Sequence, residues 1–272
     1  MSKFSFLISI YKNEKPEWFR EALDSVFAQT VQPDEIVLVE DGPLTLELYS
    51  VIDHYKVKHP IFNIVMNEKN LGLGLALQKG LLACRNEAIV RMDTDDVIPV
   101  DRFEKQMKAF DKGYDVVSCW SQLYVGDLNN VIAVKTRPEH HEDIVKLAHK
   151  RSPVCHAGAV LRKSAVIKAG NYQHYHLYED YYLWVRMILA GAKFYNVQKV
   201  LYYVRTTEEQ VGRRSGWNYF KTEMSVFREF KQMGFYTTKD FIVNSAIRMV
   251  ARLAPKGIRS FLIKKAWNHK EA

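Results

Sequence analysis

Short apolar runs rich in β-branched residues alternate with helical patterns along the first hundred residues, and this alternation restricts the chain to few folds. The runs FSFLISI (4–10), EIVLVED (35–41), FNIVMN (62–67) and AIVRM (88–92) have the length and composition of buried strands. Helical patterns over 16–30, 46–58 and 72–85 separate them. This order predicts an α/β fold with a mostly parallel central sheet and helices on both faces.

The pattern continues less regularly to about residue 205. Helices are expected at 102–110, 141–150 and 179–191, and strands at 115–125, 130–135, 156–162 and 199–205. No Gly/Ser-rich or Pro-rich linker interrupts 1–205, so a single domain is predicted there. Residues 206–272 differ in kind and are predicted to form a helical, basic extension.

The net charge of +8 is concentrated near the C-terminus, where residues 241–270 hold seven Lys or Arg and no Asp or Glu. Apolar residues there recur at helical spacing: Phe241, Ile242, Ala246, Met249, Val250, Leu253, Ile258, Phe261, Leu262 and Trp267. Two interpretations carry equal weight: a helix pair lying on an anionic membrane surface through 239–270, or helices packed on the protein with a solvated basic face.

Cysteines and the N-terminus exclude several classes of protein. Cys84, Cys119 and Cys155 lie far apart and form no CxxC or paired metal-ligand spacing, which indicates buried thiols in a reducing compartment. The first apolar run is too short for a signal peptide or a membrane span. We therefore expect a cytoplasmic protein, either free or peripheral on the inner face of the cell membrane.

Three carboxylates crowd the end of the fourth expected strand, in IVRMDTDDVIP (89–99). Asp93, Asp95 and Asp96 repel one another unless a cation lies between them, and oxygen ligands at a strand end suit Mg²⁺ or Mn²⁺ beside a substrate phosphate. An EF-hand is excluded, because its sixth position would be Ile98 rather than glycine. Aspartates that merely cap the following helix remain an alternative.

Two further motifs lie at the same predicted edge of the sheet. In LVEDGP (38–43), Glu40 and Asp41 could accept hydrogen bonds from a ribose or base, or Asp41 could simply begin a turn. The stretch NEKNLGLGLALQKG (67–80), which contains Asn70, is neither a GxGxxG fingerprint nor a P-loop. Redox-cofactor and kinase-type chemistry are therefore disfavoured.

A second acidic pair begins a later helix, in YEDYYLWVRM (178–187). Glu179 and Asp180 could stabilise the helix N-terminus through its dipole, or one of them could act as general base toward a hydroxyl. The surrounding tyrosines and histidines are suited to stacking on sugars, although such residues more often serve in packing.

Taken in order, these motifs resemble family 2 glycosyltransferases of the GT-A fold. A strand ending in a tyrosine, an acidic pair after the second strand, an Asn-x-Gly stretch, a DxD and a later Glu-Asp all occur between residues 4 and 205. The chain looks most similar to bacterial enzymes that build capsule, exopolysaccharide or O-antigen units. The resemblance implies a nucleotide-sugar half at about 1–100 and an acceptor half at about 101–205.

The resemblance also implies a role for each motif. Asp180 would be the catalytic base with Glu179 beside it, and Asp93 and Asp95 would bind the divalent cation, Mn²⁺ or Mg²⁺. The remaining residues would bind the donor nucleotide and its diphosphate: Tyr11, Glu40, Asp41, Asn70, Asp93, Arg205 and Arg213. Thr206 and Thr207 stand where several relatives carry a metal-binding histidine, and Leu77-Gln78 replaces a frequent Arg-Asn pair.

The implied reaction is inverting transfer of a single sugar from a nucleotide-diphosphate sugar, expected to be UDP-linked, to a hydroxyl of a saccharide or lipid-linked acceptor. The QxxRW motif of processive synthases is absent. A sugar nucleotidyltransferase is the first alternative, although the glycine-rich loop typical of that class is missing after the first strand. A non-catalytic sugar-binding module is the second. Nucleic acid is not expected as a partner, because the carboxylates repel phosphate.

Overall fold

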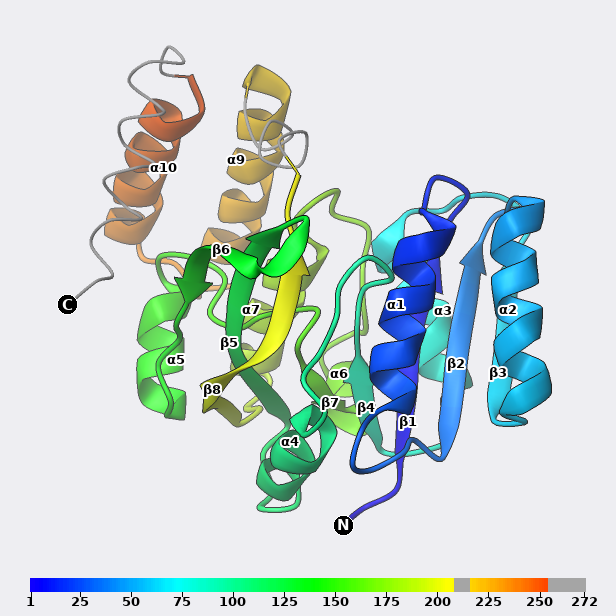
Figure 1. The fold of residues 1–272 in the computed structure, drawn as a ribbon. Coiled ribbons are helices and arrows are strands. Elements are labelled where there is room, and N and C mark those ends of the chain that lie inside the picture. The colour runs from blue at the N-terminus through cyan, green and yellow to red at the C-terminus, as the bar shows by residue number, and fades with distance from the viewer. Residues whose placement is uncertain (208–215, 254–272) are drawn as a thin grey trace. The chain divides into compact units, whose positions relative to one another are not determined.

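The computed structural model describes residues 1–207 and 216–253, and the chain divides into two compact units (Figure 1). The first unit is Met1–Arg205 and the second begins at Thr206. The two units are described separately below.

Four parallel strands form the first half of the sheet, as their continuous apolar runs predict. They are β1 (Phe4–Ile10), β2 (Glu35–Asp41), β3 (Phe62–Asn67) and β4 (Ala88–Arg91). In the central strand β1, Ile8 packs into one hydrophobic core and Leu7 into the other, and both are fully buried. The sheet is therefore covered on both faces, and the carboxyl ends of these strands share one edge.

The second half of the sheet is mixed. Its strands are β5 (Val116–Val125), β6 (Asp127–Lys135), β7 (Val160–Arg162) and β8 (Phe194–Arg205). The sheet order is β3-β2-β1-β4-β7-β5-β6, with β8 paired to β5. β7 is antiparallel to both neighbours, whereas β5 and β8 are parallel. The predicted class, α/β with a mostly parallel sheet, is confirmed.

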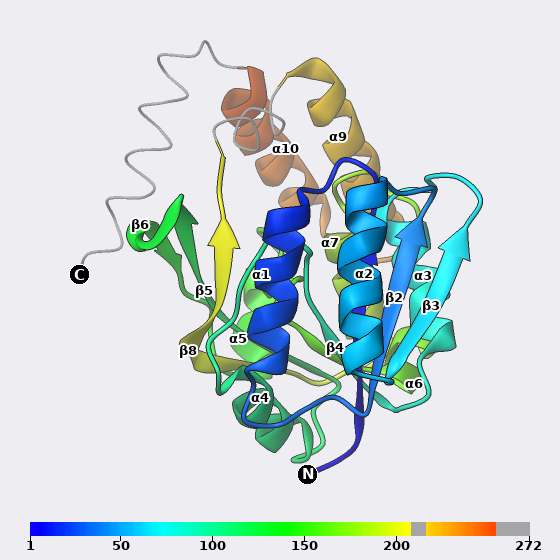
Figure 2. The same ribbon diagram turned by 45° about the vertical axis from the view of Figure 1, so that its right-hand side comes forward.

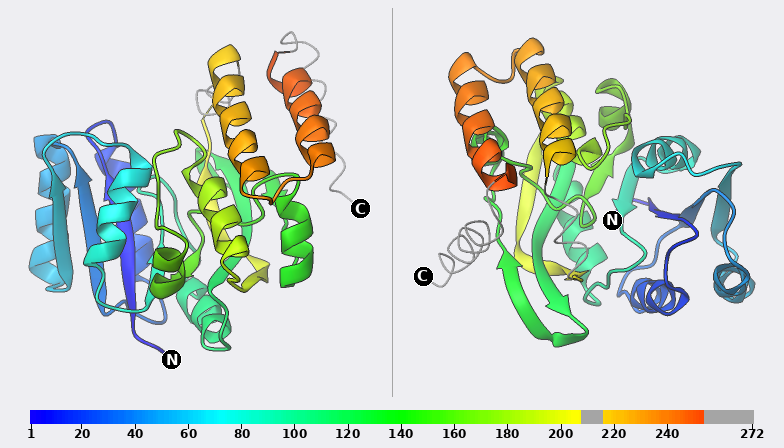
Figure 3. Two further views of the ribbon diagram at one scale, coloured as in Figure 1. Left: turned by 180° about the vertical axis from the view of Figure 1, so that it is seen from behind. Right: turned by 90° about the horizontal axis from the view of Figure 1, so that it is seen from above.

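Helices cover both faces of this sheet. One face carries α1 (Pro16–Phe27), α2 (Leu46–Lys58) and α4 (Arg102–Phe110). The other carries α3 (Leu73–Ala83), α5 (His141–Ala148), α6 (Lys163–Lys168) and α7 (Glu179–Leu189). Figure 2 shows α1 and α2 in front of the strands, and the rear view in Figure 3 shows α3 on the opposite side.

Three predicted strand boundaries were wrong. The strand expected at 130–135 begins three residues earlier, at Asp127. The strand expected at 156–162 is limited to Val160–Arg162, because a turn occupies the residues before it, where Ala159 donates its backbone N–H to the His156 carbonyl at 3.2 Å. A Cβ on Gly158 would lie 3.2 Å from Cys119 Sγ, so close packing explains the glycine in this turn. The strand expected at 199–205 begins earlier, at Phe194, because β8 pairs in parallel with β5 from Phe194 to Arg205, with register shifts at Trp120.

The second unit contains α9 (Trp217–Gln232) and α10 (Thr238–Leu253). Glu223 of α9 is 1% exposed and forms ion pairs with Arg248 and Arg252 of α10, each with a nitrogen-to-oxygen distance of 3.1 Å. These two arginines therefore join the two helices of the second unit.

The apolar positions of α10 lie instead at the surface of the second unit. Ile242, Ile247, Met249 and Val250 are each at least 50% exposed. The predicted apolar positions from Ile258 onward lie outside the described residues. Within 1–207 and 216–253, none of the helices combines the length and the hydropathy that crossing a bilayer requires.

Candidate active site

The acidic and polar motifs of the sequence meet at the carboxyl-end edge of the parallel strands. Tyr11 follows β1, Asp41 ends β2 and Asp93 follows β4 closely. Because β2 and β4 flank β1 in the sheet, these three side chains come from neighbouring strands. Tyr11 is half-buried, and its carbonyl accepts the backbone N–H of Glu14 at 3.1 Å.

Asp93, Asp95 and Asp96 form one cluster at this edge, as predicted. One carboxylate oxygen of each lies within 4.8 Å of the others. Burial and the neighbouring Asp93 raise the pKa of Asp95 to about 6. Carboxylates that are buried close together repel one another and therefore need a compensating positive charge. Hard divalent cations accept such oxygen ligands. The cluster therefore fits a divalent cation.

Arg91 is a site residue that the sequence reasoning missed. It is 1% exposed within β4, and its Nη2 pairs with Asp93. This contact raises the pKa of Arg91 against the opposing effect of burial. A single charged residue inside an otherwise apolar strand was the available signal, because a buried guanidinium needs a carboxylate partner. Arg91 fixes the position of Asp93 from within the sheet.

Asp96 faces the protein interior. It is 3% exposed, and its Oδ1 accepts the backbone N–H of Arg205 at 2.8 Å. Burial and the two other aspartates raise the pKa of Asp96 well above its ordinary value, while the Arg205 N–H and Tyr202 oppose that shift. Asp96 thus joins the acidic loop to the end of β8, a structural role that explains why the motif has a third aspartate.

Arg205, predicted to contact the donor diphosphate, lies against the same loop. Its Nε donates to the Asp95 carbonyl at 2.9 Å, and its Nη2 pairs with Glu21 of α1. The guanidinium carbon lies 5.0 Å from the Trp18 ring centre and 5.1 Å from that of Tyr124. Arg205 therefore contributes positive charge beside Asp95. Arg213, the other predicted arginine, lies outside the described residues.

Asp41 organises the loop before α3. Its Oδ1 accepts hydrogen bonds from Asn67 at 2.9 Å and from the Leu71 N–H at 2.8 Å, and its Oδ2 accepts the Gly72 N–H at 2.9 Å. Asn70 Oδ1 accepts the same Gly72 N–H at 3.1 Å, and the residue is exposed. Gly72 has φ +86, a conformation that glycine adopts without strain.

Glu40 and Asp41 point to opposite faces of β2, because successive strand residues alternate. Glu40 is 5% exposed, and its surroundings include Tyr49, Asp53 and Lys56 of α2. Burial raises the pKa of Glu40. The structure therefore separates the acidic pair that the sequence places side by side, and only Asp41 faces the α3 loop.

The second acidic pair lies at the N-terminus of α7. Asp180 Oδ2 accepts a hydrogen bond from the Ser152 hydroxyl, with an oxygen-to-oxygen distance of 3.1 Å. Glu179 Oε2 is buried without a hydrogen-bond partner among the described residues, and burial raises the pKa of Glu179 to about 7. A Cβ on Gly74 of α3 would lie 3.2 Å from Glu179 Cβ, so this glycine permits the close approach.

The two acidic sites lie within electrostatic range of each other. The charge of Asp93 raises the pKa of Glu179, and that of Arg91 lowers it, although burial is the larger cause. One site can thus hold a cation and phosphate while the other faces a hydroxyl. Such an arrangement suits group transfer from a diphosphate to an alcohol.

Comparisons with known proteins identify the family. The model of glycosyl transferase family 2 matches residues 5–170. The amylovoran biosynthesis glycosyltransferase AmsE of Erwinia amylovora is 39% identical over 265 residues, covering 96% of this chain and 98% of that protein. The UDP-Gal:alpha-D-GlcNAc-diphosphoundecaprenol beta-1,3-galactosyltransferase of Escherichia coli is 34% identical over 265 residues, covering 97% and 96%.

A solved structure supports the fold. S. aureus TarS 1-349 in complex with UDP-GlcNAc matches with a TM-score of 0.69 at 16% identity, covering 92% of this chain and 73% of that chain. The fold is therefore GT-A, as the resemblance implies. Because the family model covers more than half of the chain, and relatives at 39% and 34% identity cover nearly all of it, this chain belongs to glycosyltransferase family 2.

Proposed function

We propose that the protein is an inverting glycosyltransferase that moves one sugar from a UDP-linked donor to a hydroxyl of a saccharide or lipid-linked saccharide in surface polysaccharide synthesis. The observation that carries this proposal is the pair of carboxylate sites within one unit: Asp93 and Asp95 after β4, and Asp180 at the start of α7. The E. coli relative is named for a UDP-sugar donor and a lipid-linked acceptor, which supports both substrate classes.

Asp180 is proposed as the catalytic base. Its Oδ2 accepts a hydrogen bond from Ser152, which fixes the orientation of the carboxylate. The acceptor oxygen would attack the anomeric carbon as its proton passes to Asp180, and the bond to the nucleoside diphosphate would break on the opposite face. Positioned proton transfer of this kind contributes typically about 10²–10⁴-fold in rate.

Asp93 and Asp95 would hold Mn²⁺ or Mg²⁺. When bound, the cation supplies positive charge that neutralises the developing charge of the departing diphosphate. Arg91 orients Asp93 from inside the sheet, and the Arg205 guanidinium, bonded to the Asp95 carbonyl, adds charge on the other side. Arg213 is proposed as a further diphosphate contact on the basis of the resemblance alone.

The nucleoside would lie over residues 1–100, with Tyr11 stacked against the base. Asp41 is proposed to act through the loop that its carboxylate organises, which presents Asn70 to the ribose or base. Glu40 would act less directly, since it faces α2. Residues 101–205 would bind the acceptor, and the residues from 206 onward form the extension.

A panel of nucleotide sugars, tested with Mn²⁺, Mg²⁺ or EDTA, examines the proposal directly. Release of nucleoside diphosphate with one donor, dependent on acceptor and on metal, is the expected result. Absence of both binding and turnover for every donor in every metal would contradict it.

We further propose that the protein attaches to the inner face of the cell membrane through α10. The outward side chains Ile242, Ile247, Met249 and Val250 can enter the interface between lipid headgroups and acyl chains. Lys239 is exposed at the start of the same helix and suits an anionic surface. If the acceptor is linked to a lipid, attachment to the membrane would bring the active site to its substrate.

A further inference from the structure

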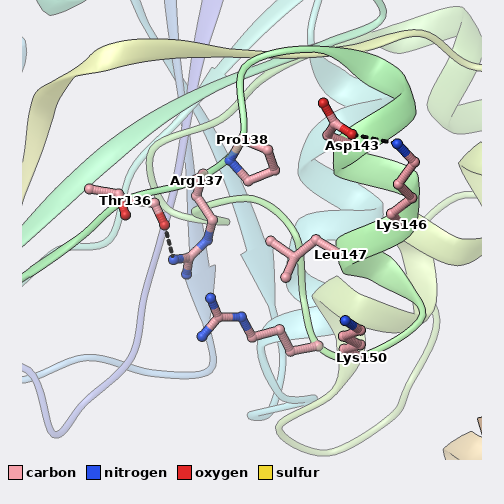
Figure 4. A pocket seen from close by; sticks show the side chains of 8 residues that line it. Thr136, Arg137, Pro138, Asp143, Lys146, Leu147 and Lys150 are labelled. Carbon is pink, nitrogen blue, oxygen red and sulfur yellow. Dashed lines mark hydrogen bonds and ion pairs between the residues drawn. The ribbon is translucent and has the colours of Figure 1, made fainter. Parts of the chain in front are cut away.

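A basic cavity of about 310 Å³ lies in the acceptor half of the first unit. Its wall combines the segment after β6 with α5 and the turn that follows α5, and it includes Arg137, Lys146, Lys150 and Arg151 (Figure 4). The lining contains a single carboxylate, Asp143, which is bonded to Lys146 at 2.7 Å. The cavity therefore carries an excess of positive charge, as an anion site requires.

Arg137 is the cation in this lining whose position the dipole of α5 does not explain. Lys146 and the two cations after it lie near the C-terminal end of α5, where positive charge is favoured by the helix dipole. Arg137 lies two residues after β6, and its Nη1 donates to the Thr136 carbonyl at 2.9 Å, whereas its Nε is buried without a hydrogen-bond partner among the described residues. Burial lowers the pKa of Arg137, and the charge of Arg151 lowers it further. The charge of Asp180 opposes this effect, so Arg137 lies within electrostatic range of both Arg151 and Asp180.

The backbone around Arg137 is held firmly. Its carbonyl accepts hydrogen bonds from the Trp120 indole at 3.1 Å and from the Gln198 amide at 3.2 Å. The next carbonyl, that of Pro138, accepts from Asn196 at 2.7 Å. This segment is anchored to β5 and β8, so the cavity has a wall built in advance of any ligand.

The cavity adjoins the proposed catalytic base. Arg151 lines it, and the next residue, Ser152, donates to Asp180 at 3.1 Å. The Tyr181 hydroxyl of α7 also donates to the Ala148 carbonyl at the end of α5. Two hydrogen bonds therefore tie the turn that carries the cations to the N-terminus of α7.

We infer that this cavity binds the diphosphate of an acceptor whose first sugar is linked through that group to a lipid. The inference rests on the proposed function and specifies its acceptor. In a sugar diphosphate the accepting hydroxyl and the diphosphate are substituents of the same sugar ring. An enzyme that places a base at the hydroxyl therefore needs an anion site about one sugar ring away from that base. Arg137 and Arg151 supply guanidinium forks, which match phosphate oxygens.

Binding of geranyl diphosphate in EDTA tests the inference by calorimetry. Without metal, the cluster at Asp93 repels diphosphates, so the cavity is the favourable site in the first unit. The double variant Arg137→Gln/Arg151→Gln should bind at least about tenfold more weakly, because two charge-assisted contacts are lost. Lys112→Gln, a change at an exposed cation outside the cavity, should bind as the unchanged protein does.

Three results would overturn the inference: equal binding by the double variant, displacement of geranyl diphosphate by UDP in the same EDTA buffer, or clearly tighter binding of inorganic pyrophosphate than of geranyl diphosphate. The second would assign the cavity to the donor, and the third to a free anion. Thermal denaturation checks that both variants remain folded. Because the assay needs no turnover, a failure of sugar transfer with intact diphosphate binding would count against the proposed function alone.

Discussion

Arg205 donates its backbone N–H to Asp96 Oδ1 at 2.8 Å, and this bond joins the acidic loop after β4 to the last residue of β8. Replacing Asp96 by alanine leaves a buried N–H without an acceptor, which should lower the free energy of unfolding by about 1–3 kcal/mol. Urea denaturation measures this change. Asp96→Asn retains an acceptor oxygen and should cost less.

Metal affinity separates the role of Asp96 from that of Asp95. Asp95→Asn should abolish measurable Mn²⁺ binding, whereas Asp96→Asn should change it only a few fold. Equal loss in both variants would make Asp96 a cation ligand and contradict the structural role assigned to it.

Mn²⁺ binding should weaken as the pH falls through about 6, the value to which burial and Asp93 raise the pKa of Asp95. A proton and the cation compete for this carboxylate, so each further pH unit should reduce the apparent affinity about tenfold. Without metal, the raised pKa means that stability is lost as pH rises from the ordinary value of 3.8 through about 6. The increase in Tm on adding Mn²⁺ should therefore be larger at pH 7.5 than at pH 5, and an equal increase would exclude this coupling.

The fold and the family were predictable because they depend on patterns local in sequence. Apolar runs of strand length and helical spacing between them fix β1 to β4 and place Asp41 and Asp93 at one edge. What sequence could not show was which side chains already have partners. Arg91 and Asp93 are close in sequence, but their pairing depends on the burial of β4, and the bond from Arg205 to Asp96 spans 109 positions.

The C-terminal extension shows the same limit more sharply. The sequence of α10 shows an apolar face and a basic face, but it does not show which of them packs against the protein. Glu223 of α9 determines which face of α10 packs against α9, because it forms ion pairs with Arg248 and Arg252, whereas Ile247 remains exposed. The helix α9 lies within the extension predicted to be helical, but its mixed pattern of charges and aromatics gave no bounds for it.

Asp180→Asn should abolish sugar transfer while leaving donor affinity within a few fold, because the amide keeps an acceptor for Ser152 but cannot take a proton at neutral pH. Ser152→Ala should lower kcat less, since it removes only the bond that orients the carboxylate. Donor affinity is measured by calorimetry and transfer by release of nucleoside diphosphate. Loss of donor binding in Asp180→Asn would argue against a base.

Glu179→Gln should stabilise the protein at pH 8 and have little effect below about pH 4.5. In the folded protein burial raises the pKa of Glu179 to about 7, so ionisation opposes folding as pH rises from 4.5 through 7. The gain should approach about 3 kcal/mol, because the pKa differs by about 2.5 units between the unfolded and folded states and each unit is worth about 1.4 kcal/mol. Chemical denaturation at both pH values measures it. The matched control is Glu142→Gln on the exposed face of α5, which should show no such difference.

Ile247→Glu combined with Val250→Glu should abolish flotation of the protein with anionic liposomes. Both side chains are more than half exposed on α10, so the changes place charge on the surface proposed to enter the membrane without disturbing the core. Truncation before α10 is a poorer test, because it would leave Glu223 buried and unpaired. Leu46→Glu, at an 83% exposed leucine at the start of α2, is the matched control and should float as the unchanged protein does. Undiminished flotation of the double variant, with sugar transfer to a soluble acceptor intact, would show that another surface binds the lipid.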